Sequence, residues 1–140
     1  QTALGEKYAN GQGVAQDDKE AVKWYRLAVE QGDANAEQNL AMMFYLGRGV
    51  PQDDNEAARR YRHAADQGYA NAQYNLGRMF FRGRGVPQDN VKSYFWLSLA
   101  ITVTGESASK LRDEVANSLS PEQIAEVQKL AREWKPKKAE

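Results

Sequence analysis

The sequence contains no cysteine, and that absence removes several kinds of chemistry at once. Disulfide bonds, thiolate nucleophiles and zinc–thiolate sites are excluded. There is a single histidine, His63, so a metal site built on two histidines is excluded as well. A histidine-based nucleophilic site would need that one side chain beside a serine or a carboxylate. The sequence therefore predicts no catalytic residue, no metal ligand, no cofactor and no enzymatic activity.

An excess of charge of one sign is also missing. Lys plus Arg and Asp plus Glu number 19 each, which gives a formal net charge of zero. A nucleic-acid partner is therefore not expected. No apolar run approaches the ~18 residues of a membrane span, since Ser98 and Thr102 interrupt the longest one, so no membrane insertion is expected. The proportions of hydrophobic (41%) and charged (27%) residues are typical of a globular protein.

What the sequence does contain is an internal repeat. The segment GRGVPQDD at 47–54 returns as GRGVPQD at 83–89, and in a related form as GQGVAQDD at 11–18. The offset is 36 residues each time, and apolar positions keep the same register. Aligned at this offset are Leu4, Leu40 and Leu76; Tyr8, Phe44 and Phe80; and Ala28, Ala64 and Ala100.

Each repeat predicts two helices. Asp17 and Asp53 suit the N-cap of the second helix, because their carboxylates can accept the free amides of its first turn. Glycine follows the end of that helix in the pairs Gln31–Gly32 and Gln67–Gly68. The next helix shows apolar residues every four positions, as in Ala36, Leu40 and Phe44. Aromatic residues at equivalent helix positions, namely Trp24, Tyr25, Tyr61 and Trp96, are interpreted as packing between units.

The end of the chain departs from the repeat. The helix that contains Tyr94 to Ile101 is apolar nearly all round, which predicts burial on several sides. A break at Thr102–Glu106 precedes another helix, and Ser120–Pro121 marks the start of a last one. This pair of helices, residues 105–134, is expected to close the array, and residues 135–140 are expected to form a frayed tail.

These patterns resemble the Sel-one-like repeat (SLR), a relative of the tetratricopeptide repeat. The resemblance rests on Asn75-Leu76-Gly77, Phe80 and the segment Gly83 to Asp89, and on Trp24-Tyr25 with its flanking alanines. It covers about residues 1–100. It implies an all-α fold, a right-handed α-solenoid of antiparallel helix pairs with a C-terminal capping helix pair. The single domain would span residues 1–134, with units at about 1–32, 33–68 and 69–104.

The resemblance also implies a function. Such proteins are mostly adaptors or scaffolds, and their first helices line a concave groove that binds a partner protein segment or a peptide. Carried over by position, the candidate partner-binding residues are Asn35, Asn39, Met42, Tyr45, Asn71, Tyr74, Asn75, Arg78, Phe81 and Arg82. Asn39 and Asn75 fall where related domains grip a peptide backbone or its terminal carboxylate. The matching lysine is absent, so a strict carboxylate clamp is not expected.

The glycine loops allow two interpretations. A glycine-rich loop before a helix can cradle a phosphate. Here aspartates occupy the helix start and would take the amides themselves, so we interpret the loops as punctuation between helices. The arginines of the middle unit, among them Arg48, Arg60 and Arg78, could steer an acidic partner or form a solvated surface.

Three alternatives to a binding module stay open. The chain could be a spacer within a longer solenoid, and its truncated first helix could then fray or self-associate with another copy. A weak hydrolase or a small-molecule-binding protein is disfavoured, because no nucleophile and base pair is visible. A bacterial origin is expected from the closing helices, with a periplasmic, envelope or secreted location favoured over the cytoplasm.

Overall fold

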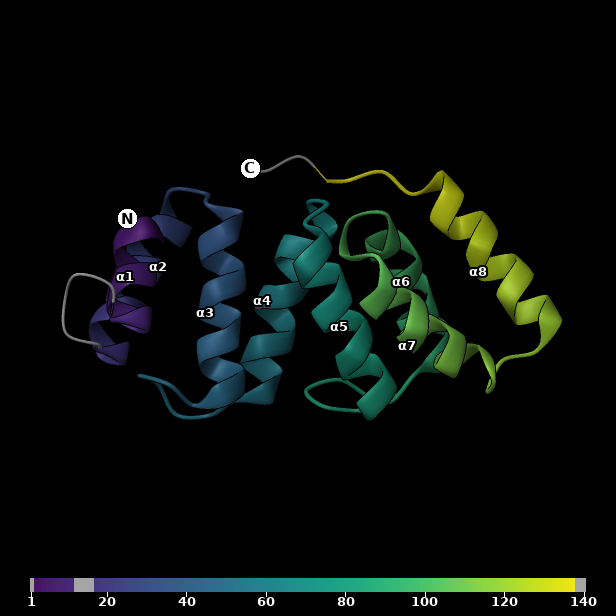
Figure 1. Cartoon of the computed structure of the whole chain (residues 1–140), viewed down its shortest axis with the longest axis horizontal. Helices are drawn as coiled ribbons and strands as arrows, with labels where there is room; N and C mark the ends of the chain where they lie inside the picture. The colour runs from purple at the N-terminus through teal and green to yellow at the C-terminus, as the bar shows by residue number, and fades with distance from the viewer. Residues whose placement is uncertain (1, 12–16, 138–140) are drawn as a thin grey trace.

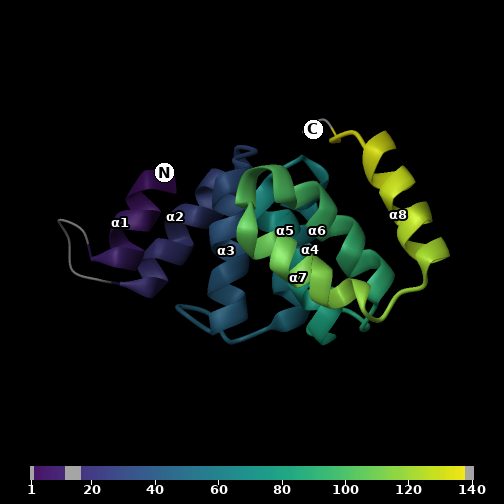
Figure 2. The same ribbon diagram turned by 45° about the vertical axis from the view of Figure 1, so that its right-hand side comes forward.

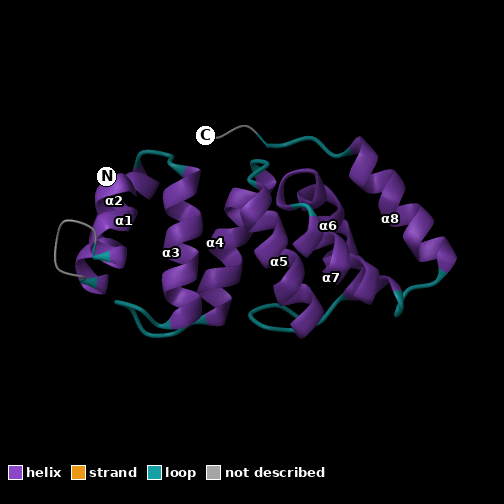
Figure 3. Cartoon of the chain, viewed as in Figure 1, coloured by secondary structure: helices purple, strands orange, loops and turns teal. Residues whose placement is uncertain are grey.

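The computed structural model describes residues 2–11 and 17–137 (Figure 1). Within these ranges the chain forms eight helices and no strand, as Figure 3 shows. The helices are α1 (Thr2–Asn10), α2 (Asp18–Glu30), α3 (Ala34–Leu46), α4 (Asp54–Asp66), α5 (Ala70–Arg82), α6 (Asn90–Thr104), α7 (Glu106–Ala116) and α8 (Pro121–Glu133).

The first six helices form three pairs that stack along the long axis of the molecule. The two helices of each pair pack against each other. Each pair also packs against the next in chain order, from α1 and α2 at one end to α5 and α6 (Figure 1). This arrangement confirms the predicted all-α solenoid. In such a stack, the position of one unit on the next depends on the contacts between neighbouring units.

The helices begin where the sequence predicts. Asp17, Asp53 and Asp89 lie at the N-caps of α2, α4 and α6, and each side chain accepts a hydrogen bond from the backbone N–H three residues later. Ser120 caps α8 in a complete capping box with Gln123. Each aspartate therefore occupies one of the amides that a phosphate would need, as expected if the loops are punctuation between helices. For the first loop this holds at Asp17, while residues 12–16 lie outside the described ranges.

A pair of charged side chains joins each of the second and third loops, 47–54 and 83–89, to the repeat before it. Arg48 donates from Nε to Asp18 Oδ2 at 3.2 Å and from Nη2 to Oδ1 at 2.7 Å. One repeat later, Arg84 makes the same two contacts with Asp54, at 3.1 and 2.9 Å. Both pairs thus have the two-point geometry that is favoured between guanidinium and carboxylate groups. We call Arg48–Asp18 and Arg84–Asp54 the inter-repeat pairs.

The second glycine of each loop allows this contact. Gly49 and Gly85 have positive φ angles of 73° and 75°. A Cβ atom added to Gly85 would overlap the carbonyl oxygen of Asp54, and one added to Gly49 would overlap that of Asp18. The loop backbone therefore rests directly on the first residue of the preceding repeat's second helix, and a side chain at either position would push the two apart.

The buried side chains form two clusters. The larger runs through α1 to α6 and includes Tyr25, Leu40, Tyr61 and Leu76. The smaller joins α6 to the closing helices and contains Tyr94, Leu97, Ala100, Ala108, Val115 and Val127. Helix α6 contributes to both, through Trp96 in the first and Leu97 in the second, which confirms that its all-round apolar character reflects burial on several sides.

The two closing helices both pack on α6, and they diverge from each other (Figure 2). Val127, the one buried residue of α8, joins the smaller cluster. Beyond α8 the chain returns to α4: the Trp134 ring lies edge-on to Trp96 at 6.4 Å, and the Lys137 N–H donates to the Asp66 carbonyl at 2.7 Å. Of the tail predicted to fray, residues 135–140, the structure describes 135–137, which lie along the second helices, while 138–140 lie outside the described residues.

Replacing Gly85 by alanine tests the close approach of the loops. Gly32→Ala is the matched control, because Gly32 has a φ of 85° but a Cβ atom added there would meet no other atom within 4 Å. Both variants carry the cost of a positive φ, about 1–2 kcal/mol. Gly85→Ala should lose a further ~1–3 kcal/mol from the clash with Asp54. Urea unfolding followed by circular dichroism measures both losses, and equal losses would contradict the close packing of the loop.

Candidate functional site

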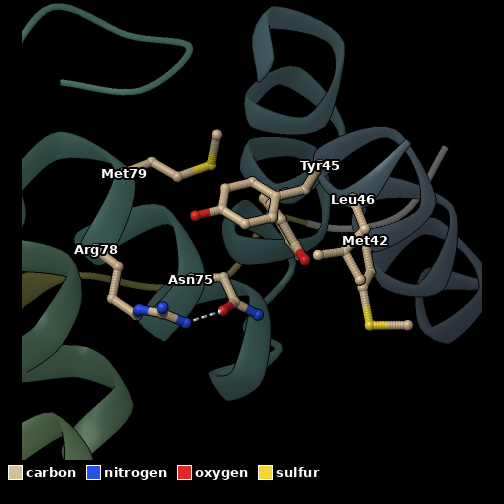
Figure 4. Close-up of a pocket in the computed structure, with 7 residues that line it drawn as sticks. Met42, Tyr45, Leu46, Asn75, Arg78 and Met79 are labelled. Atoms are coloured by element: carbon tan, nitrogen blue, oxygen red, sulfur yellow. Dashed lines mark hydrogen bonds between the residues drawn. The ribbon is translucent and has the colours of Figure 1, made fainter. Parts of the chain in front are cut away.

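A cavity opens between α3 and α5, the first helices of the second and third units. Its volume is about 290 Å³, and we call it the apolar pocket. Figure 4 shows Met42 and Leu46 on one side, Met79, Arg78 and Asn75 on the other, and the Tyr45 ring between them. Tyr61, which comes from α4 between these two helices, completes the lining.

A second hollow continues from the apolar pocket toward α1. It measures about 590 Å³, and its lining is mostly polar, so we call it the polar trough. Met42, Tyr61 and Asn75 line both, so the two hollows form one groove across α1, α3 and α5. The lining of the polar trough is Thr2, Ala3, Glu6, Asp33, Asn35, Gln38, Asn39, Met42, Tyr61, Asn71 and Asn75.

Most of the candidate residues from the sequence lie in this groove. Each of them comes from α3 or α5, which share the lining with residues of α1 and α4. The candidates that line the apolar pocket or the polar trough are Asn35, Asn39, Met42, Tyr45, Asn71, Asn75 and Arg78. Their spacing by 36 residues places Asn35 with Asn71, and Asn39 with Asn75, at matching positions on neighbouring helices.

Tyr74, Phe81 and Arg82 are not among the residues that line the apolar pocket or the polar trough. Tyr74 and Phe81 are half-buried against the smaller cluster, which joins α6 to the closing helices. Phe81 is the repeat equivalent of Tyr45, but the last repeat is followed by the closing helices, which cover it. Arg82 is exposed at the end of α5.

Three lining residues of the apolar pocket escaped the sequence interpretation: Leu46, Tyr61 and Met79. Tyr61 was expected to be packing only, and at 5% exposure it is indeed buried, but it also lines both parts of the groove. Leu46, 53% exposed, is the last residue of α3 and forms an apolar edge to the pocket. The signal in the sequence that could have indicated Leu46 was its position, as an apolar residue at the end of a predicted helix.

The loop arginine Arg84 holds the wall of the apolar pocket. Its guanidinium carbon lies 4.1 Å from the centre of the Tyr45 ring, and its Nη1 donates to the Tyr45 hydroxyl at 2.5 Å. In the preceding repeat, Arg48 donates from Nη2 to the backbone carbonyl of Ala9 at 2.8 Å, the position equivalent to Tyr45. The same inter-repeat contact therefore fixes the orientation of an aromatic wall only between the second and third units.

At the α1 end of the groove, polar side chains bind one another. Asn39 donates from Nδ2 to Glu6 Oε1 at 3.2 Å, and the Thr2 hydroxyl donates to Asp33 Oδ2. Asp33 also accepts the backbone N–H groups that begin α3. The acidic groups at this end are thus engaged by neighbouring donors, while the amide of Asn71 is exposed to solvent.

The arginines of the middle unit are mostly held in ion pairs rather than presented as a free basic patch. Arg59 and Arg60 contact Glu56, Arg62 contacts Asp66, and the two loop arginines form the inter-repeat pairs. Most of these arginines are therefore paired with a carboxylate. Arg78 differs from them, because it lies in the apolar pocket.

The single histidine lies outside the groove. His63 is exposed, and its Nδ1 is 3.4 Å from Oε1 of Glu37, a buried carboxylate that also contacts Arg60. These contacts join α3 to α4. Among the described residues no group of His, Asp and Glu side chains is placed to hold a metal ion, and no helix is long and apolar enough to cross a membrane.

The buried tyrosines give a titration test of the groove lining. Burial raises the pKa of Tyr61 to about 12, with Arg78 acting in the opposite direction, and burial also raises the pKa of Tyr25 to about 12. An unfolded tyrosine ionises near pH 10. The neutral phenol is favoured in the folded state, so the stability contributed by Tyr61 is present below pH ~10 and is lost as the pH rises toward 12.

Absorbance at the phenolate band should accordingly show tyrosines that ionise only near pH 12, and Tyr61→Phe should remove one of them. Tyr25→Phe is the companion variant and should remove another. A Tyr61→Phe curve that retains the full late phase would show that Tyr61 is in contact with solvent rather than buried in the lining.

The comparisons with known proteins agree with this geometry. The family model described as Sel1 repeat matches residues 1–33, 34–69 and 70–102. The structure of a Sel1 repeat protein from Oxalobacter formigenes is similar to the chain, with a TM-score of 0.79 and 26% sequence identity, over 94% of this chain and 56% of that one. Among curated proteins, none matches the chain.

A second solved structure is similar as well. It is a protective antigen present in uropathogenic Escherichia coli strains that displays an SLR fold, with a TM-score of 0.68 and 26% identity, over 95% of this chain and 36% of that one. The chain therefore spans about half or less of the length of these two proteins. Both come from bacteria, which supports the expected bacterial origin. Sel1 repeat proteins generally mediate protein–protein interactions and are typically not enzymes. With three matched repeats stacked in one solenoid, the chain belongs to the Sel1 repeat family.

Proposed function

We propose that the chain is a binding module that holds an extended segment of a partner protein in the groove, and so acts as an adaptor. The observation that carries this proposal is the chemistry of the lining, which changes along one continuous groove. Side-chain amides of Asn39 and Asn75 lie in the polar trough, and the apolar pocket follows directly. The amides of the polar trough can bind the backbone of a peptide, and the apolar pocket at one end can hold one of its side chains.

The amides are the polar groups that suit this task best. Each carries both a donor and an acceptor, as does each peptide unit of an extended chain. Asn35 and Asn71, and Asn39 and Asn75, repeat at the same positions of α3 and α5. An extended segment crossing these helices would therefore meet the same pair of amides twice.

The test uses random dodecapeptides displayed on phage and selected on the immobilised chain. Selected sequences are then made as synthetic fluorescent peptides, and their Kd values are measured by anisotropy. The double variant Asn39→Ala/Asn75→Ala should weaken binding about tenfold, because two hydrogen bonds contribute about 0.5–1.5 kcal/mol each. Asn55→Ala/Asn117→Ala is the matched control, since both asparagines are exposed and lie outside the groove lining.

Circular dichroism and thermal midpoints establish that both double variants keep the fold. A normal affinity for the control, together with the tenfold loss for the groove variant, supports the proposal. Equal affinities for all three proteins would place the binding surface elsewhere and overturn it, as would a selection that yields no binding peptide.

A further inference from the structure

Arg78 is the charged group of the apolar pocket, and its environment differs from that of the other arginines in the middle unit. Its Nη1 reaches only the neutral Asn75 Oδ1, at 3.4 Å, and its guanidinium lies 5.6 Å from the centre of the Tyr74 ring. Within the described part of the chain, no carboxylate lies within ion-pair distance of it. The inter-repeat arginines, in contrast, are each bound by an aspartate at two points.

The rest of the groove does not balance this charge. Its acidic side chains, Glu6 and Asp33, lie at the α1 end and already accept hydrogen bonds from Asn39 and Thr2. In the lining near Arg78 the other ionisable side chains are the phenols of Tyr45 and Tyr61 rather than carboxylates, and burial favours the neutral form of Tyr61. The apolar pocket is thus the positive end of the groove, and a ligand with a carboxylate at this end would meet an unpaired guanidinium.

The pocket beside Arg78 also defines what else the ligand should carry. Met42, Leu46 and Met79 supply its apolar surface, and its volume of about 290 Å³ is at the lower limit of small-molecule sites. A cavity of this size takes a single apolar side chain rather than a cofactor. Methionine side chains adapt to different shapes, so leucine, methionine and phenylalanine should all be accepted.

We propose that the groove selects a partner segment in which an apolar side chain lies two residues from a carboxylate, an inference that rests on the proposed function. The apolar side chain occupies the pocket formed by Met42, Leu46 and Met79, and the carboxylate binds Arg78. In an extended peptide, residues two apart point to the same side, so both groups can enter one end of the groove together. The partner is a protein with an exposed acidic and apolar motif of this kind.

Three synthetic peptide pools test this specificity. All are fluorescent dodecapeptides with a fixed central leucine. The two positions that lie two residues before and after the leucine are both Asp in the first pool, both Asn in the second and both Lys in the third. All other positions are random neutral residues. Placing the charge on both sides makes the test independent of peptide direction. The wild-type chain should bind the Asp pool about tenfold more tightly than the Lys pool, with the Asn pool between them, as measured by anisotropy.

Arg78→Glu should reverse the order of the pools, and Arg78→Gln should abolish the discrimination while leucine-dependent binding persists. Arg132→Glu, at an exposed position on α8, makes the same change in net charge and should leave the order unchanged. If Arg132→Glu reverses the order as well, the preference comes from overall charge, and the assignment to Arg78 is overturned.

The two proposals fail in different ways. Binding of all three pools with equal affinity, lost in Asn39→Ala/Asn75→Ala, would overturn the acidic specificity and leave the groove as the binding surface. Binding that is equal among pools and unaffected by that double variant would overturn both. An unchanged fold in every variant is established by circular dichroism.

Discussion

The contact between a loop arginine and the aspartate that begins the preceding repeat's second helix is the interaction on which the rest of the structure depends. It occurs twice with the same geometry, in Arg48–Asp18 and Arg84–Asp54. Both pairs are partly exposed, so each contributes only about 1 kcal/mol. Their importance is positional: each joins residues 30 apart in the chain across a boundary between units. Gly49 and Gly85 let the backbones touch at the same boundary, so neighbouring units have little freedom to slide or rotate.

This contact also connects the scaffold to the groove. Arg84 binds Asp54 through one edge of its guanidinium and the Tyr45 hydroxyl through Nη1, so one side chain fixes both the unit boundary and a wall of the apolar pocket. The third repeat lacks this contact. Asn90 stands where the first two repeats have Asp18 and Asp54, and no GRG loop follows it. Asn90 accepts a hydrogen bond from Gln88 at 2.6 Å, as Asp54 does from Gln52, but it has no arginine partner among the described residues. At this position of the repeat, aspartate occurs in the two units that are followed by a loop arginine, and asparagine occurs in the unit that is not.

Periodicity predicted the helices and their caps, because these depend on residues close in the sequence. Asp17 and Asp53 cap where expected, and the positions of Asn39 and Asn75 in the groove followed from the family resemblance. Features that depend on neighbouring units were not predictable in this way. Phe81 looks like Tyr45 in the sequence, yet the closing helices cover it. The pairing of Arg84 with Asp54 was also missed, although its register was visible: every arginine of a GRG loop has an aspartate 30 residues earlier.

Hydrogen exchange of backbone amides in Arg84→Gln tests most directly whether the inter-repeat pairs hold the loops in place. The Arg84 and Asp89 N–H groups bind the carbonyls of Met79 and Phe80, and Arg48 and Asp53 make the equivalent bonds in the preceding loop. Loss of about 1 kcal/mol at one boundary should accelerate exchange about fivefold at Arg84's position and at Asp89, and leave the loop around Asp53 unchanged. Unchanged exchange in both loops, or equal acceleration in both, would contradict the central role given to this contact.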